Sequence, residues 1–207
     1  MLVVDDHTLF RKGVMRIIEN DPKIEIVDEA VSGKEAVNKI NSNPFDCILL
    51  DIWLPGENGL QVLKQIKCID PDIPVIMLSM YPEGQYGIRA LRAGASGYVT
   101  KTIPPRELIN SIHTVCNGGK YISTNLALEL ATMIDKRIKG PLHESLTDRE
   151  MQILTLMATG KSVSKIAREF NLSVKTVSTH RANILKKMGF DNNAELIRYA
   201  INNRLVF

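Results

Sequence analysis

Four short apolar runs in the first half of the chain each end at a polar or charged residue. Runs of this length, separated by helical patterns, are typical of buried parallel strands. The terminal residues are Asp5 and Asp6 after residues 2–4, Asp51 after 47–50, Ser79 after 75–78 and Lys101 after 97–100. Ligands bind outside the carboxyl ends of the strands in an open parallel sheet. We therefore expect three carboxylates, a hydroxyl and an ammonium group at one edge.

The spacing of these runs predicts a repeated strand–helix order. The strands are expected at residues 2–4, 24–30, 46–52, 73–80 and 97–101. Helices are expected at 9–20, at 60–68, near 85–93 and at 104–118. A further helix is expected to begin at residue 33, where Ser32 and Glu35 form a capping box. This order predicts an α/β doubly wound fold, a five-stranded parallel sheet of flavodoxin-like size.

The pattern after residue 146 is wholly helical. Thr147 and Glu150 form a second capping box, and two short helices meet at the turn 171–173. Two helices joined by a three-residue turn indicate a helix-turn-helix, followed here by a last helix at 193–203. We expect a first domain at 1–119, a linker at 120–145 and a small all-α domain at 146–207. Within the linker we expect a helix at 120–140 and a flexible joint at 142–145.

Charge is divided between the two ends of the chain. Residues 1–118 carry 12 basic and 15 acidic side chains, a net of −3, whereas residues 144–207 carry 10 and 6, a net of +4. Residues 174–190 hold four basic side chains and no acidic one. A basic helix beside an acidic domain favours nucleic acid as the partner of the second domain.

The three cysteines, Cys47, Cys68 and Cys116, lie within apolar patterns and share no metal-binding spacing. Their odd number argues against a disulfide framework, so we expect buried thiols in a reduced, cytoplasmic protein. The sequence shows neither a signal-peptide pattern nor an apolar stretch long enough to cross a bilayer. We expect no membrane partner.

The expected cluster of acids suits a cation and a phosphoryl group. Mg²⁺ prefers oxygen ligands and is held by one or two carboxylates together with waters and phosphate oxygens. A carboxylate such as Asp51 can also attack phosphorus to give an aspartyl phosphate. Lys101 and Ser79 would then offer a positive charge and a hydroxyl donor to the added phosphoryl oxygens.

The residues of the first domain resemble the receiver domain of two-component response regulators. The resemblance rests on residues 3–7 (Val-Val-Asp-Asp-His), Asp51-x-x-Leu-Pro-Gly, Ser79 and Tyr98-x-x-Lys101. It implies that Asp51 accepts a phosphoryl group from a sensor histidine kinase. It also implies that Asp5, Asp6, Asp51 and the backbone carbonyl of Trp53 hold Mg²⁺, and that Ser79 and Tyr98 form a switch. Thr102 departs from the pattern, because many receivers have Pro after the lysine.

The tail resembles the LuxR-type helix-turn-helix, through residues 146–150, 166–167 and 172–189. The whole chain thus resembles a NarL/FixJ-type response regulator. A recognition helix needs an apolar stripe for docking and a polar stripe for the groove, and Val177, Ile184 and Met188 supply the first. The candidates for base contacts are Lys175, Ser178, Thr179 and Asn183. The candidates for phosphate contacts are Thr176, His180, Lys186 and Lys187.

Affinity favours a dimer on two promoter half-sites of double-stranded DNA, because one small helix-turn-helix offers a limited interface. We expect a homodimer that depends on phosphorylation. By resemblance, the last helix would pair through Glu195, Leu196, Tyr199 and Asn203, although Leu196 could equally belong to the core. The receiver contact could use either the first and fifth helices or the fourth and fifth.

Other classes of protein fit the sequence less well. A haloacid dehalogenase-type phosphatase needs a second Asp two positions after the nucleophile, where this chain has Trp53. An RNA-binding antiterminator would need stacking aromatic residues on the groove face. A constitutive DNA-binding regulator with a phosphorylation-independent receiver is the alternative that stays open. We expect no enzyme, only a phosphoacceptor that removes its own phosphoryl group.

Overall fold

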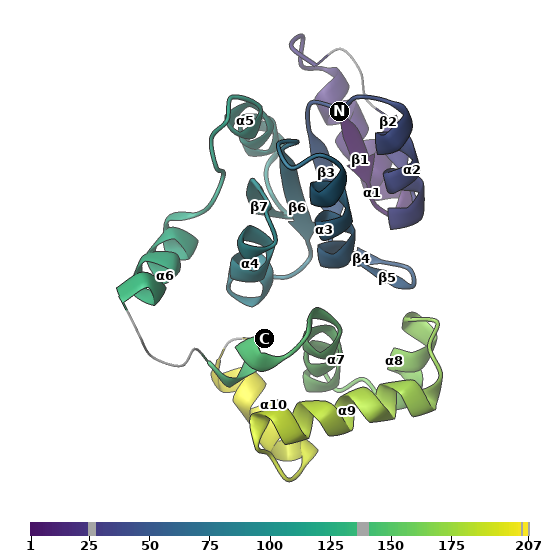
Figure 1. Cartoon of the computed structure of the whole chain (residues 1–207), viewed down its shortest axis with the longest axis vertical. Helices are drawn as coiled ribbons and strands as arrows, with labels where there is room; N and C mark the ends of the chain where they lie inside the picture. The colour runs from purple at the N-terminus through teal and green to yellow at the C-terminus, as the bar shows by residue number, and fades with distance from the viewer. Residues whose placement is uncertain (25–27, 136–140, 204, 207) are drawn as a thin grey trace. The chain divides into compact units, whose positions relative to one another are not determined.

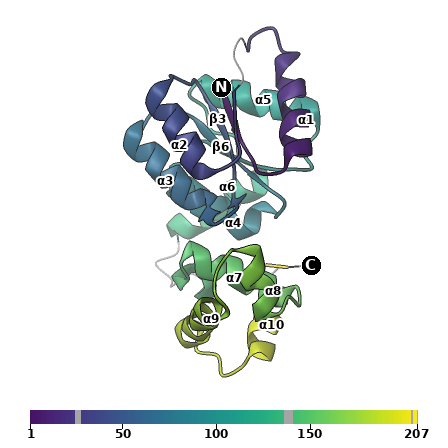
Figure 2. The same cartoon turned by 90° about the vertical axis from the view of Figure 1, so that its right-hand side faces the viewer.

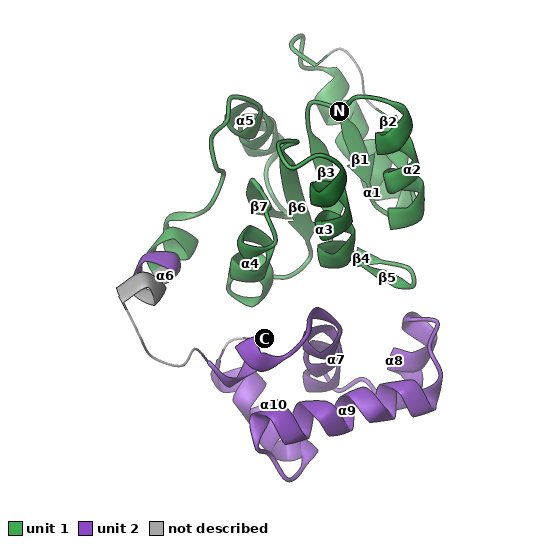
Figure 3. Cartoon of the chain, in the orientation of Figure 1, with its two compact units in different colours: residues 1–128 green, residues 129–207 purple. Residues whose placement is uncertain are grey.

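The computed structural model describes every residue except 25–27, 136–140, 204 and 207 (Figure 1). The chain divides into two compact units, Met1–Leu128 and Glu129–Phe207 (Figure 3). The division separates an α/β unit from an all-helical unit, as the sequence predicted.

The first unit is built on a five-stranded parallel sheet with the order β2-β1-β3-β6-β7. Its strands are β1 (Leu2–Val4), β2 (Asp28–Ala30), β3 (Ile48–Asp51), β6 (Val75–Ser79) and β7 (Gly97–Thr100). The doubly wound fold is therefore confirmed. Of the second predicted strand, only residues 28–30 are strand, and residues 25–27 lie outside the described part.

Helices cover both faces of the sheet. They are α1 (Thr8–Glu19), α2 (Gly33–Ser42), α3 (Gly59–Ile69), α4 (Glu83–Arg92) and α5 (Pro105–Cys116). The strand order reverses direction after β2, and right-handed crossovers then put α1 and α5 on one face and α2, α3 and α4 on the other. Figure 2 shows α1 beside α5 and α2 beside α3, and both pairs are in contact.

The strands alternate their side chains between the two helical layers, which makes both faces of the sheet apolar. On the α1/α5 face, the strand residues pack against one side of each of these two helices. This core contains Val3, Leu49, Ile76, Leu78 and Val99 from the strands, Cys47 just before β3, Val14 and Ile18 from α1, and Leu108, Ile112 and Val115 from α5. A rigid sheet buried in this way fixes the positions of the residues that follow each strand.

The segment after β3 forms a small hairpin that the sequence had indicated only as a turn. Strands β4 (Trp53–Leu54) and β5 (Glu57–Asn58) pair antiparallel, and Gly56 takes φ +74° at the turn. Gly59, the first residue of α3, lies so close to Asp51 that a Cβ would come within 2.0 Å of the Asp51 carbonyl oxygen. The hairpin therefore returns the chain directly over the end of β3.

Two details of the first unit correct our predictions. Ser32 accepts a bond from the Glu35 amide, but the Glu35 carboxylate accepts from Val31 rather than from Ser32, so the predicted capping box is shifted by one residue. The cysteines were all expected to be buried, which is right for Cys47 and wrong for Cys68 and Cys116. Cys116 is exposed because it is the last residue of α5.

The linker helix begins later than predicted. Helix α6 spans Thr124–Asp135, whereas the sequence indicated residues 120–140, of which 136–140 lie outside the described part. Tyr121 is extended and pairs with Gly97, because its amide donates to Ser96 and its carbonyl accepts from Tyr98. This backbone pairing delays the helix.

The second unit is a cluster of short helices with well-defined caps. After the 3₁₀ turn η1 (Leu142–Ser145) come α7 (Asp148–Ala158), α8 (Val163–Glu169), α9 (Val174–Met188) and α10 (Asn193–Asn202). Thr147 and Glu150 form the predicted capping box, and Ser173 caps α9 through the Thr176 amide. Asn171 adopts the left-handed conformation at φ 53°, which makes the predicted turn between α8 and α9.

Residues 142–145, predicted to be a flexible joint, form the turn η1, which is tied to the last helix. The His143 ring nitrogen Nδ1 lies 2.9 Å from the Tyr199 hydroxyl. Among the described helices, none is both long and apolar enough to cross a membrane.

Candidate functional site

The three predicted carboxylates meet at the carboxyl edge of the sheet. Asp5 and Asp6 follow β1, and Asp51 ends β3. Together with His7, each contributes a ligand atom, and all four atoms lie within 4.8 Å of one another. Asp5 and Asp51 are buried, and Asp6 is half-buried. Buried carboxylates at this separation repel one another, so the cluster needs positive charge.

Lys101 supplies one positive charge from the end of β7. Its Nζ lies 2.6 Å from an oxygen of Asp5 and 2.6 Å from an oxygen of Asp51, and its side chain is only 5% exposed. The backbone amide of Lys101 donates to the Ser79 carbonyl at 2.7 Å, which fixes the origin of the side chain. The ammonium also lies 4.8 Å from the centre of the Phe10 ring. Lys101 thus joins the carboxylates at the ends of the neighbouring strands β1 and β3.

The charges around Asp51 do not fully stabilise its ionised form. Burial raises the pKa of Asp51 to about 6, the ammonium of Lys101 opposes the rise, and Asp5 adds to it. Burial lowers the pKa of Lys101, but Asp51 and Asp5 more than compensate, and the net change is upward. Because the folded pKa of Asp51 exceeds its ordinary value, ionisation of Asp51 removes stability as the pH rises through about 6. A second cation beside Lys101 would restore that stability.

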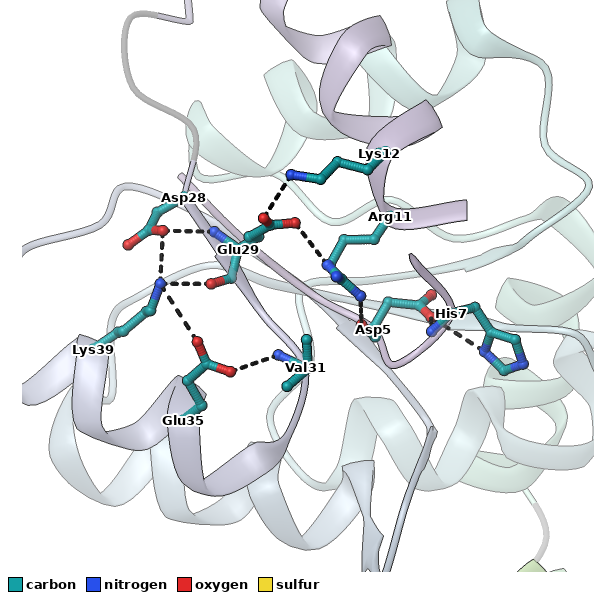
Figure 4. Close-up of polar contacts among 9 residues, drawn as sticks. All are labelled: Asp5, His7, Arg11, Lys12, Asp28, Glu29, Val31, Glu35 and Lys39. Carbon is teal, nitrogen blue, oxygen red and sulfur yellow. Dashed lines mark hydrogen bonds and ion pairs between the residues drawn. The ribbon is translucent and has the colours of Figure 1, made fainter. Parts of the chain in front are cut away.

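Arg11 is a site residue that our sequence analysis missed. This arginine is buried on the inner face of α1, its Nη1 donates to the Asp5 carbonyl at 2.6 Å, and its Nε donates to Glu29 at 2.8 Å (Figure 4). Lys12 reaches the other oxygen of Glu29 at 2.6 Å but does not contact Asp5. The sequence feature that could have identified Arg11 was its position, because it shares the apolar face of α1 with Val14.

His7 is a second residue that the sequence analysis quoted without giving it a role. Its backbone amide donates to an Asp5 carboxylate oxygen at 2.8 Å, and its Nδ1 lies 3.3 Å from the same oxygen (Figure 4). Its Nδ1 also lies 2.9 Å from an oxygen of Asp6. The turn after β1 is therefore held on both sides, by Arg11 at the Asp5 carbonyl and by His7 at the carboxylates.

Ser79 and Tyr98 lie together, as the predicted switch requires. The Tyr98 ring is fully buried, and its hydroxyl donates to the Tyr81 carbonyl at 2.7 Å. Ser79 Oγ accepts the Tyr81 amide at 3.0 Å and is also a hydrogen-bond partner of the Tyr98 hydroxyl. Burial raises the pKa of Tyr98, so the phenol keeps its proton. Both residues of the switch therefore hydrogen-bond the backbone of Tyr81, in what we call the Tyr81 segment, next to Asp51.

Trp53 connects the acid cluster to that segment. Its amide donates to an Asp51 carboxylate oxygen at 3.1 Å, and its ring lies 5.5 Å from the Tyr81 ring, centre to centre. The backbone of Trp53 is thus beside Asp51, where the sequence analysis expected it.

The predicted nucleic-acid face is the outer side of α9. Val177, Ile184 and Met188 are buried against the rest of the unit, which confirms the docking stripe. The predicted contact residues that are exposed are Lys175, Thr176, Ser178, Thr179, Asn183, Lys186 and Lys187, and His180 is half-buried. Two of these hydroxyls already bond locally, Thr176 to Ser173 and Thr179 to the Lys175 carbonyl.

Lys187 differs from the other predicted phosphate contacts. Its Nζ lies 2.6 Å from Glu150, whose buried carboxylate also accepts the Thr147 amide at 2.8 Å. Lys187 is therefore exposed but already paired with an acidic side chain of its own unit. Removing it would leave Glu150 buried and unpaired.

Helix α10 is also more engaged than we predicted. Leu196 is fully buried in its own unit, so it belongs to the core and the prediction of a dimer contact for it is wrong. Tyr199 contacts His143 through its hydroxyl, and its ring lies 5.5 Å from that of Phe190. Glu195 caps the start of the helix with Asn192. Of the predicted pairing residues, Asn203 is exposed at the end of the helix.

Comparison with known proteins supports both units. Residues 1–113 match the family described as the response regulator receiver domain, and residues 144–200 match the bacterial regulatory proteins of the luxR family. The fold and these matches thus define a receiver domain joined to a LuxR-type helix-turn-helix. The chain belongs to the NarL/FixJ-type response regulators.

Relatives match over nearly the whole length. The chain is 34% identical to the response regulator UvrY of Escherichia coli strain K12 over 206 residues, which cover 99% of this chain and 94% of that protein. It is 34% identical to the response regulator protein VraR of Staphylococcus aureus strain NCTC 8325, with 100% and 98% covered.

Solved structures give the same fold. A LuxR-family two-component response regulator from Aurantimonas sp. SI85-9A1 is 32% identical, with a TM-score of 0.59 over 65% of this chain and 96% of that one. RcsB from Salmonella enterica serovar Typhimurium, bound to a promoter with the phosphomimetic BeF₃⁻, is 23% identical, with a TM-score of 0.64 and 96% of each chain covered. At that identity, the second likeness concerns the fold alone.

Arg11 yields a prediction about cation binding. We expect Arg11→Ala to weaken Mg²⁺ binding by roughly tenfold or more, because the turn that carries Asp5 and Asp6 loses its donor. Lys12→Ala is the matched control, since it also removes a partner of Glu29 but does not touch Asp5. Calorimetric titration with Mg²⁺ measures the affinity of each variant of the full chain. Equal affinities in the two variants would contradict a positioning role for Arg11.

Proposed function

We propose that this response regulator is a phosphorylation-gated transcription factor whose phosphoacceptor is Asp51. The observation that carries the proposal is the pair of 2.6 Å contacts that Lys101 makes with Asp5 and Asp51. A buried carboxylate beside one fixed ammonium and two further acids is suited to bind a cation and to accept a phosphoryl group.

The donor set suits Mg²⁺ as a resident cofactor. We infer that Asp5, Asp6 and Asp51 hold it with the backbone carbonyl of Trp53, because all are hard oxygen ligands and the acids lie close together. When bound, Mg²⁺ would neutralise charge on the acids and on an incoming phosphoryl group. The raised pKa of Asp51 supports this assignment, since the cluster lacks positive charge without a cation.

The phosphoryl donor would be a phosphohistidine of a sensor histidine kinase. In the transfer, an Asp51 oxygen attacks phosphorus, the phosphorus–nitrogen bond breaks, and the kinase imidazole leaves. Lys101 holds the carboxylate in place and faces the charge that arrives. Hydrolysis of the acyl phosphate later restores Asp51, so we infer a phosphoacceptor that removes its own phosphoryl group and not an enzyme with a separate substrate.

Phosphorylation would be read out through Ser79 and Tyr98. The Ser79 hydroxyl is shared with Tyr98 and with the Tyr81 amide, and it can instead donate to a phosphoryl oxygen on Asp51. That exchange alters the hydrogen bonds of the Tyr81 segment and so biases the receiver between two arrangements.

The output would be promoter binding by a dimer. The exposed side of α9 carries basic and polar side chains, which suit phosphates and base edges in a major groove. The fold likeness to RcsB, solved bound to a promoter with a phosphomimetic and also as two dimers on two DNAs, supports this arrangement. We infer that the chain works in the cytoplasm, where promoter DNA lies.

Asp51→Asn is expected to abolish phosphoryl uptake from radiolabelled acetyl phosphate in the presence of Mg²⁺. The amide cannot form the acyl phosphate, whereas binding to DNA stays possible because α9 is untouched. Asp46→Asn, two residues before the start of the same strand, is the matched control and should take up label as the unaltered chain does. Label in Asp51→Asn would show that another residue is the acceptor.

Lys186→Ala is expected to reduce the salt dependence of binding to a random-sequence DNA duplex. A lost phosphate contact lowers the slope of log affinity against log salt by about 1 for each bound chain. Lys161→Ala is the control, because Lys161 already pairs with Glu169 at 2.6 Å. Fluorescence anisotropy over a range of salt gives the slopes, and equal slopes in the two variants would remove Lys186 from the interface.

A further inference from the structure

Two cysteine side chains lie together at the end of the sheet opposite the acid cluster. Cys47 directly precedes β3, and Cys116 is the last residue of α5. Both line one cavity of about 400 Å³ together with Asp46 and His113, and the two thiols are close enough to shift each other's pKa. The sequence separates them by 68 intervening residues, so their meeting is a product of the fold.

The two thiols have unequal surroundings. Cys47 is fully buried in the core between the sheet and helices α1 and α5, whereas Cys116 is exposed. The interaction with Cys47 lowers the pKa of the Cys116 thiol to about 7, although partial burial and the charge of Asp46 oppose this change. That interaction and burial raise the pKa of Cys47. The pair therefore combines an accessible, readily ionised sulfur with a protonated sulfur directly behind it.

We propose that Cys116 and Cys47 form a peroxide-reactive dithiol that closes to an intramolecular disulfide. The Cys116 thiolate attacks a hydroperoxide, the oxygen–oxygen bond breaks, and Cys116 becomes a sulfenic acid while an alkoxide or hydroxide leaves. The Cys47 sulfur then displaces hydroxide from that sulfenic acid, which forms the disulfide and, with the Cys47 proton, one water. Two thiols are oxidised and one hydroperoxide is reduced.

The cross-link would join two parts of the receiver. It ties the start of β3, the strand that ends at Asp51, to the last turn of α5. A disulfide that closes so long a loop restricts the unfolded chain, so we expect the oxidised receiver to resist denaturant better than the reduced one. The site does not depend on the proposed phosphoryl transfer, because it lies at the other edge of the sheet.

The chain carries its own control thiol. Cys68 is exposed near the end of α3, on the opposite face of the sheet from α5. The lowered pKa of Cys116 favours its thiolate near neutral pH, and the thiolate is the form that attacks a peroxide. We expect Cys116 to react with hydrogen peroxide several-fold faster than Cys68.

The test treats the reduced full chain with hydrogen peroxide near pH 7 and follows the products by peptide mass spectrometry without reduction. The unaltered chain and Cys68→Ser should each lose two thiols and give a peptide that joins Cys47 to Cys116 within one chain. Cys116→Ser should give no such peptide, and Cys47→Ala should accumulate the sulfenic and sulfinic acids of Cys116. Circular dichroism checks that each variant is folded.

Three outcomes would overturn the proposal. One is oxidation of Cys116 to the sulfinic acid in the unaltered chain without the joined peptide. Another is a disulfide between two chains as the main product, seen as a dimer on a non-reducing gel. The third is reaction of Cys68 as fast as Cys116, which would mean that the pairing with Cys47 does not activate the thiol.

Discussion

The contact on which the receiver depends is the bridge from Lys101 to Asp5 and Asp51, with both oxygens 2.6 Å from the ammonium. It joins the ends of β1, β3 and β7, three strands whose order the buried sheet fixes. Without this charge, two buried carboxylates would face each other in a poorly solvated site. With it, the cluster is still short of positive charge, as the pKa of about 6 for Asp51 indicates. A site that is stable enough to fold yet incompletely neutralised is suited to bind a cation and to accept an anionic group.

The rest of the receiver supports and reports on this bridge. Arg11 holds the turn behind Asp5, and the Trp53 amide holds one oxygen of Asp51. The Ser79 and Tyr98 hydroxyls both bond the Tyr81 backbone, whose ring lies against Trp53. A charge added at Asp51 therefore has a short route to the Tyr81 segment. In the second unit, the capping box of α7 fixes the start of that helix, and the buried stripe of α9 leaves its polar side exposed.

The sequence predicted those features that repeat with a fixed period or end at a strand. Asp5, Asp51, Ser79 and Lys101 were found because parallel strands bring their ends together. Arg11 was missed because its contact is with a backbone carbonyl, which leaves no mark in the pattern beyond a charge on an apolar face. The late start of α6 at Thr124 follows from the pairing of Tyr121 with Gly97, a contact between distant residues. The contacts of Lys187 with Glu150 and of Cys47 with Cys116 also join distant residues, and only the fold reveals them.

The measurement that tests the central claim most directly is the emission of Trp53, the sole tryptophan of the chain, during titration with Mg²⁺ and then with beryllofluoride. Trp53 bonds Asp51 through its amide and lies against Tyr81 through its ring, so it should report events at both. We expect a saturable change with Mg²⁺, a further change with beryllofluoride in the unaltered chain, and loss of that further change in Asp51→Asn. No response in the unaltered chain, together with no heat of Mg²⁺ binding in calorimetry, would contradict the account and leave α9 to be regulated in some other way.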